Sequence, residues 1–263
     1  MARTIAIACQ KGGTGKTTTT MTLGAALGAE QGQRVLLVDL DPQSSLSISV
    51  QVDVLDIEHS VYDLLQTAVR RPGAVKELLE VAVAHTNLEN VDVIPATLEL
   101  ASAELELTSA LEREKVLKNV LAPLQRSYDF ILLDCPPSLG ILTVNALVAA
   151  DQVLVPTEAD FLALRGVQLF MGTTLPQIRA GLNKRLRTAG ILITKMDHRT
   201  LHAREVEEAL RKEFGELVLA PVIPQTVKIR DASVAGTTIL SFARTSPAAQ
   251  AYRNVATTLL NGA

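Results

Sequence analysis

The chain has 263 residues, 48% of them hydrophobic, with a formal net charge of −3 and a pI near 5.9. This composition suits a soluble globular protein with a sizeable core and excludes one coated in positive charge, so any nucleic-acid contact must be a local patch. The two cysteines, Cys9 and Cys135, lie far apart without metal-ligand spacing, which argues against a disulfide framework. Because MARTIAIACQ lacks a signal-peptide pattern and no apolar run approaches about 18 residues, we expect a cytoplasmic protein without a membrane partner.

Short apolar runs bounded by turn residues predict buried strands along the chain. In chain order these are Thr4–Ala8, Arg34–Val38, Val91–Ile94, Phe130–Leu133, Gln152–Val155, Gly190–Ile193 and Val218–Val222. Helix-length stretches lie between most of them, at Lys16–Glu30, Leu139–Ala149 and His202–Phe214. Strands that alternate with helices predict an α/β fold with a doubly wound, mainly parallel sheet covered by helices on both faces.

The domain organisation follows from what the sequence lacks. We find no repeat, no low-complexity segment and no linker rich in proline, glycine or serine, so we expect a single domain over residues 1–263. The region from about Ser44 to Asn90 is the least periodic, and its element boundaries stay open.

The stretch CQKGGTGKTTTT at residues 9–20 follows the first predicted strand and opens the first predicted helix. Its glycines let backbone N–H groups turn toward an anion with no Cβ in the way, and the helix N-terminus adds its dipole. In such a loop Lys16 meets the β and γ phosphates of a nucleotide and the Thr17 hydroxyl ligates Mg²⁺. A glycine-rich turn without a ligand is the alternative, but the lysine, the threonine and the flanking elements together favour nucleotide binding.

The sequence resembles the deviant Walker A ATPases, the family that includes the ParA/Soj partition proteins and MinD. The resemblance rests on KGGTGKTT at 11–18, VLLVDLDPQ at 35–43 and DCPPSLG at 134–140, with VIPAT at 93–97 and VIPQTVKI at 222–229. It spans nearly the whole chain and is strongest with the ParA/Soj branch. It implies a P-loop NTPase fold that hydrolyses ATP to ADP and phosphate with Mg²⁺. The nucleotide would lie against Lys11, Gly12, Gly13, Thr14, Gly15, Lys16, Thr17, Thr18 and Pro224.

Lys11 stands where the standard phosphate loop has glycine, four residues before Gly15. In the family this first lysine reaches across a nucleotide-sandwich homodimer to the phosphates held by the other subunit. The resemblance therefore implies a catalytic role for Lys11 in trans, alongside Lys16 in cis. A cation that is supplied only when two ATP-loaded subunits meet couples nucleotide state to dimerisation. A solvated loop lysine is the alternative.

Aspartates follow two of the predicted strands, with Asp39 and Asp41 after the second and Asp134 after the fourth. The carboxyl ends of parallel strands meet beside the phosphate loop, where ligands bind in such sheets. The resemblance implies that Asp41 orients the attacking water, that Asp39 supports the metal shell and that Asp134 is the Walker B-type carboxylate on Mg²⁺. Ordinary turn carboxylates at strand ends are the alternative. The loop at residues 136–140 would respond to the γ-phosphate on the same resemblance, or be only a tight turn.

Basic residues gather late in the chain. Between Arg179 and Arg230, eleven lysines and arginines face six acidic residues, a net of +5 that leaves −8 for the rest. We expect Lys195 and Arg199 in one loop, and Lys228 and Arg230 in another, each following a strand on the same side of the sheet. In the ParA/Soj branch, basic residues at matching positions bind DNA non-specifically. Gln225 departs from the family pattern, and scattered surface bases are the alternative. With no helix-turn-helix, we expect contact with phosphates and no sequence reading.

Three functions compete. The leading one is an ATP-dependent dimerising switch that binds nucleoid DNA and positions a chromosome, a plasmid or another cargo, with a ParB-like or other adaptor protein stimulating hydrolysis. A MinD-like membrane switch needs a basic amphipathic tail helix, but Ala248–Ala263 carries the single charge of Arg253 and indicates a packed final helix. A small-molecule P-loop enzyme is disfavoured by Lys11 and by DCPPSLG. The cargo stays open.

Overall fold

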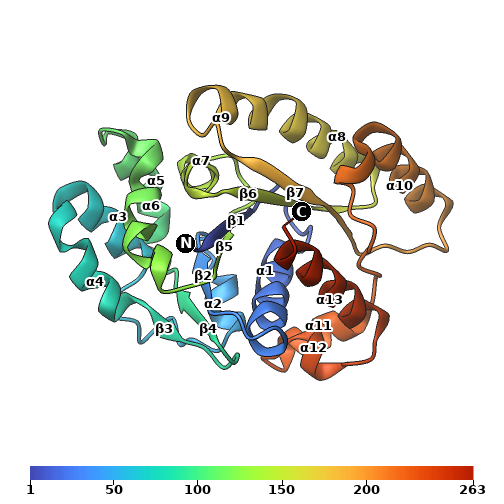
Figure 1. Cartoon of the computed structure of the whole chain (residues 1–263), viewed down its shortest axis with the longest axis horizontal. Coiled ribbons are helices and arrows are strands. Elements are labelled where there is room, and N and C mark those ends of the chain that lie inside the picture. The colour runs from blue at the N-terminus through green and yellow to red at the C-terminus, as the bar shows by residue number, and fades with distance from the viewer. Residues whose placement is uncertain (263) are drawn as a thin grey trace.

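The computed structural model describes residues 1–262 and is built around a seven-stranded sheet (Figure 1). The strands are β1 Arg3–Ile7, β2 Val35–Asp39, β3 Ala84–His85, β4 Val91–Ile94, β5 Phe130–Asp134, β6 Gln152–Glu158 and β7 Arg187–Thr194. Their order is β3-β4-β2-β5-β1-β6-β7, and every pairing is parallel except that of β3 with β4. The predicted α/β fold with a mainly parallel sheet is therefore confirmed.

Helices connect the strands and cover the sheet. They are α1 Lys16–Ala25, α2 Ser45–Ser49, α3 Val61–Arg70, α4 Val75–Ala82, α5 Leu100–Thr108, α6 Val116–Leu121, α7 Ile141–Ala149, α8 Phe161–Leu169, α9 Leu175–Gly181, α10 Leu201–Phe214, α11 Val227–Val234, α12 Ile239–Phe242 and α13 Pro247–Leu260. Residues 26–30 and 170–174 continue α1 and α8 as π-helical turns. Among the described residues, no helix has the length and apolar character needed to cross a bilayer.

The strands carry almost unbroken apolar sequence because both faces of the sheet are buried. Leu36 and Val38 of β2 enter a core formed with α3 to α10, whereas Val35 and Leu37 enter a second core formed with α1, α2, α12 and α13. Figure 1 shows these two helical layers on either side of the sheet. Each fully buried leucine or valine stabilises the fold by about 1.5–3 kcal/mol. The two cores therefore hold the strands in place, and with them the loops at the carboxyl edge of the sheet.

Helix α13 packs against α1 as the predicted final helix. Tyr252 is fully buried between them, its hydroxyl lies 3.3 Å from Thr19 Oγ1, and burial raises its pKa to about 12. Arg253 makes an ion pair with Glu30 at the end of the first helical segment (2.8 Å). The prediction extended to residue 263, which lies outside the described residues.

Two parts of the prediction are wrong. Residues 218–222 form no strand and make a single bridge to β7, from Val218 to Ile191, because Pro221 lacks the N–H group that a ladder requires. The basic pair Lys228 and Arg230 was expected in a loop but lies on α11. The short antiparallel strand β3, in the region left open, was not predicted.

Candidate functional site

The phosphate loop at residues 9–15 joins β1 to α1 at the carboxyl edge of the sheet. Gly13 and Gly15 adopt left-handed backbone with φ of 78° and 82°, which glycine reaches without steric cost. Gly15 caps α1 and offers no side chain to the first N–H groups of that helix. Those donors and the helix dipole therefore face the loop, as an anion site requires.

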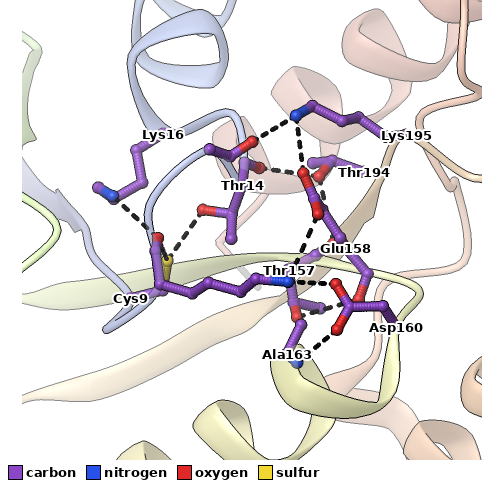
Figure 2. A network of polar contacts seen from close by, with 11 residues as sticks. Cys9, Thr14, Lys16, Thr157, Glu158, Asp160, Ala163, Thr194 and Lys195 are labelled. Atoms are coloured by element: carbon purple, nitrogen blue, oxygen red, sulfur yellow. Dashed lines mark hydrogen bonds and ion pairs between the residues drawn. The ribbon is translucent and has the colours of Figure 1, made fainter.

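Lys16 stands on the first turn of α1 and folds back over the loop. Only 7% of the residue is exposed, and its Nζ lies 3.4 Å from the carbonyl oxygen of Lys11 (Figure 2). Thr17 and Thr18 follow on the same turn and are half-buried. The loop thus concentrates one ammonium and a helix N-terminus at a single point.

One contact from β7 and one within the loop hold Thr14 in place. Thr194 Oγ1 donates to the carbonyl oxygen of Thr14 at 2.8 Å, and the Cys9 sulfur lies 2.9 Å from Thr14 Oγ1 (Figure 2). The contact of Thr194 with the loop was not predicted from sequence. Thr194 is the last residue of β7, and the carboxyl ends of parallel strands meet at one edge, so the contact could have been predicted had the order of β6 and β7 been known.

Two aspartates are completely buried beside the loop. Asp39 and Asp134 occupy partner positions of β2 and β5, and Asp134 is also paired in register with Ile7 of β1. Asp39 accepts hydrogen bonds from Ser47 N and Oγ at 2.9 and 2.7 Å. These bonds connect Asp39 to α2 and fix its carboxylate beside Asp134.

The carboxylate of Asp134 has fewer hydrogen bonds than that of Asp39. Its Oδ1 accepts from Thr20 Oγ1 at 3.2 Å, whereas its buried Oδ2 has no hydrogen-bond partner among residues 1–262. Burial, together with the charge of Asp39, raises the pKa of Asp134 well above that of an ordinary aspartate, and the hydroxyl of Thr17, the charge of Lys16 and the hydroxyl of Thr20 only partly offset this. Burial also raises the pKa of Asp39. A buried carboxylate oxygen without a hydrogen-bond partner, in a carboxyl group that interacts with Thr17 and Lys16, fits a hard divalent cation such as Mg²⁺.

Asp41 lies on the turn that follows β2 and is partly exposed. Its Oδ1 accepts from the N–H of Gln43 at 3.0 Å, which makes a tight local turn. The structure therefore brings Asp41 to the same sheet edge as the phosphate loop, outside the buried carboxylate pair.

The side chain of Lys11 contacts different groups from that of Lys16. Its Nζ is hydrogen-bonded to Asp160 Oδ2 and lies 3.6 Å from Glu158 Oε2 (Figure 2). Burial lowers the pKa of Lys11, but the two carboxylates outweigh this and raise it. Burial alone would raise the pKa of Asp160, but its hydrogen bonds with Lys11 and with backbone N–H groups outweigh burial, so its pKa lies below the ordinary aspartate value. Neither acid was predicted from sequence.

Lys195 contacts one of the same two acids. Its Nζ lies 2.5 Å from the carbonyl oxygen of Gly13 and 2.7 Å from Glu158 Oε1, and its φ of 51° is left-handed (Figure 2). The predicted DNA contact therefore has its ammonium on the phosphate loop in this structure.

The other predicted DNA contacts lie on neighbouring segments. Met196 bridges Pro224, which places the starts of residues 195–199 and 224–230 side by side. The side chain of Arg199 is 89% exposed and makes a bidentate ion pair with Asp197, in which Nε donates to Oδ1 at 2.8 Å and Nη2 donates to Oδ2 at 2.7 Å. Lys228 and Arg230 are exposed on α11. Pro224, the predicted nucleotide contact, lies where these segments meet.

Comparison with known proteins places these features in a family. Residues 2–188 match a family model described as an AAA domain. The chain is 46% identical over 256 residues to the chromosome-partitioning ATPase Soj of Thermus thermophilus, covering 97% of this chain and 94% of Soj. It is 40% identical to the sporulation initiation inhibitor protein Soj of Bacillus subtilis, with 97% of each chain covered.

A solved structure of a nucleotide-bound protein is similar over nearly the whole chain. The structure of cobyrinic acid a,c-diamide synthase from Mycobacterium smegmatis with bound ATP analog and magnesium is 40% identical, with a TM-score of 0.83, and the match covers 99% of this chain and 95% of that one. The family model covers residues 2–188, and the Soj relatives match 97% of the chain, the deviant phosphate loop included. The chain belongs to the ParA/MinD family of P-loop ATPases and is itself an ATPase.

Proposed function

We propose that this ATPase is a positioning switch. ATP-loaded subunits form a homodimer, the dimer binds DNA without sequence preference, and an adaptor protein stimulates hydrolysis and so releases the DNA. The Soj relatives, similar over nearly their whole length, support this use of the fold. The switch would work in the cytoplasm on the nucleoid, with a chromosome, a plasmid or a protein assembly as cargo.

ATP and Mg²⁺ are the cofactors, in keeping with the nucleotide and magnesium of the solved relative. Lys16 and the N-terminus of α1 bind the β and γ phosphates, and Thr17 and Asp134 hold the cation with Asp39 behind them. Bound there, Mg²⁺ would neutralise phosphate charge and compensate the orphan oxygen of Asp134.

Asp41 orients the water that attacks the γ-phosphate. Its position on a partly exposed turn, beyond the buried pair, suits a residue that meets water. Positioning of this kind dominates phosphoryl transfer, because little covalent chemistry falls to the protein.

One observation carries the dimer proposal: the two lysines of the loop contact different groups. Lys16 is 7% exposed and its Nζ lies 3.4 Å from a carbonyl oxygen of the loop, whereas the Lys11 side chain is 33% exposed and its ammonium contacts the carboxylates of Asp160 and Glu158. A cation held in a partly exposed cluster can move to the phosphates of a second subunit. That exchange would make dimerisation depend on ATP in both subunits.

The proposed DNA surface combines Arg199 with Lys228 and Arg230 on the adjoining helix. They are exposed, and a dimer doubles their number, so individually weak contacts suffice once ATP has joined two subunits. Lys195 would add less, because its ammonium is engaged at the phosphate loop.

The experiment is retention on random-sequence DNA with ATP, with ADP and without nucleotide. We expect retention with ATP alone, and none for Lys16→Ala. Equal retention in all three conditions would contradict the switch.

A second candidate is ATP-dependent activation of a small molecule. It is favoured by the similarity to cobyrinic acid a,c-diamide synthase from Mycobacterium smegmatis. ATP turnover without any small-molecule substrate, stimulated by DNA, supports the switch. Turnover that requires cobyrinic acid and an amide donor supports the alternative.

A further inference from the structure

Four charged side chains form a cluster beside the phosphate loop. Lys11 and Lys195 provide two positive charges, and Glu158 at the end of β6 and Asp160 at the start of α8 provide two negative ones (Figure 2). The proposed roles in nucleotide and DNA binding leave the two acids unused. Their arrangement suggests that they govern where Lys11 lies.

Asp160 is fixed in position by the helix that follows it. Its Oδ1 accepts from the N–H of Ala163 at 2.9 Å and so caps α8, which leaves Oδ2 for Lys11. A capping carboxylate has little freedom to follow the ammonium. If Lys11 moves to another subunit, it must leave Asp160 behind.

Glu158 divides its oxygens between two lysines. Oε1 lies 2.7 Å from Lys195 and Oε2 lies 3.6 Å from Lys11. Because Lys195 also contacts the Gly13 carbonyl oxygen, it draws Glu158 toward the loop. Lys11 therefore receives only the more distant half of this carboxylate.

We propose that Asp160 and Glu158 are positioning residues that hold Lys11 within its own subunit, and that Lys195 weakens this hold by occupying Glu158. The inference rests on the proposed function, in which Lys11 reaches the phosphates of a second copy of this chain. One ammonium cannot occupy both places, so the carboxylates compete with the second subunit's nucleotide and set the concentration at which dimers form.

The expected size follows from exposure. Lys11 and Asp160 are each 33% exposed in their side chains, and an ion pair of this kind changes an equilibrium by about two- to fivefold. A symmetric dimer would release two such pairs. The combined effect on the dimerisation equilibrium is therefore about tenfold.

The test is sedimentation with Mg²⁺ and a non-hydrolysable ATP analogue, read as the protein concentration at half-maximal dimer. Asp160→Asn keeps an acceptor for the α8 cap but removes the charge, and should lower that concentration about tenfold. Glu158→Gln should lower it about threefold, and it decides the matter if Asp160→Asn does not fold. ATP-analogue affinity, measured on dilute monomers, should stay within about twofold of the parent.

Lys195→Met gives the result that separates positioning from simple support. Losing Lys195 leaves both Glu158 oxygens to Lys11, so dimerisation should need about threefold more protein. Glu158 and Lys195 are partners in one ion pair, and a merely structural pair would give effects of the same sign. Opposite signs support the proposal, and effects of the same sign overturn it.

Lys11→Ala distinguishes this inference from the function on which it rests. If Lys11→Ala dimerises like the parent, the role of Lys11 in trans fails and the inference fails with it. If Lys11→Ala blocks dimerisation while Asp160→Asn and Glu158→Gln leave the half-maximal concentration unchanged or raised, only the inference is overturned.

Discussion

Two groups of charges lie at the same edge of the sheet but are balanced in opposite ways. Asp39 and Asp134 are fully buried, and Asp134 keeps an oxygen without a hydrogen-bond partner among the described residues. The cluster of Lys11, Lys195, Glu158 and Asp160 is partly exposed, and its four charges pair with one another.

The buried pair of aspartates needs a ligand to balance its charge, whereas the cluster of four paired charges is balanced without one. Uncompensated charge in a dry interior is costly, so the buried pair is completed when a cation arrives. Charges already paired near solvent cost little to rearrange, which suits a contact that must change during a cycle. We therefore propose that nucleotide binding and dimerisation depend on different lysines of one loop.

The largest expected effect is on the buried side. Lys16→Ala removes the cation that faces the β and γ phosphates, and should weaken ATP binding on the order of 100-fold. Equilibrium titration with a fluorescent ATP analogue measures this, with Lys118→Ala, an exposed lysine on α6, as the matched control. Unchanged affinity in Lys16→Ala would remove the phosphate-loop assignment.

Asp41→Ala should separate binding from turnover. The phosphate contacts remain and the water loses its orienting group, so steady-state hydrolysis should fall on the order of 100-fold while ATP-dependent dimers persist. Phosphate release and sedimentation measure the two properties. Loss of ATP binding would instead make Asp41 a metal or structural residue.

Asp134→Asn should raise stability while it abolishes the response to metal. Without Mg²⁺ it removes a buried charge and should stabilise the fold by about 2 kcal/mol, or roughly 4–8 °C in Tm. Mg²⁺ with ADP should then add less stability to the variant than to the parent. Thermal unfolding with and without EDTA is the measurement.

The pH dependence is the internal control for Asp134. Because its pKa is raised in the fold, the folded protein binds this proton more tightly than the unfolded chain does. In EDTA the parent should therefore lose stability as pH rises above about 4, the ordinary aspartate value, and Asp134→Asn should reduce that slope. An unchanged slope would assign the pH dependence to other groups.

The smallest expected effect concerns the DNA surface. Arg199→Glu or Lys228→Glu should weaken retention while ATP-dependent dimers survive, and each lost phosphate contact should reduce the slope of log affinity against log salt by roughly 0.9. Arg230→Glu should have less effect. Arg185→Glu, an exposed arginine before β7, is the charge-matched control. Equal losses in all variants would indicate net charge alone.

The sequence predicted the local parts of the site well. Lys16 and Thr17 follow a strand within a glycine-rich turn, and Asp39 and Asp134 end apolar strands, so each signal lies within a few residues. Parallel strands then bring the two acids together without further information. The roles of these residues remain predictions, because geometry alone does not reveal turnover.

The rest depends on contacts between distant segments. Asp160 is 149 residues from Lys11, and their pairing follows from β6 lying next to β1, an order that the apolar pattern does not encode. Lys195 was assigned to DNA for its charge, whereas β7 brings its ammonium to the phosphate loop. Pro221 was visible in sequence and could have demoted the seventh predicted strand.

The division of labour between the two lysines is tested most directly by sedimentation of Lys11→Ala with Mg²⁺ and a non-hydrolysable ATP analogue. We predict ATP-analogue affinity within about threefold of the parent and no dimer at concentrations where the parent is dimeric, because only the charge that links subunits is gone. A Lys11→Ala protein that binds the analogue and still dimerises like the parent would contradict the account.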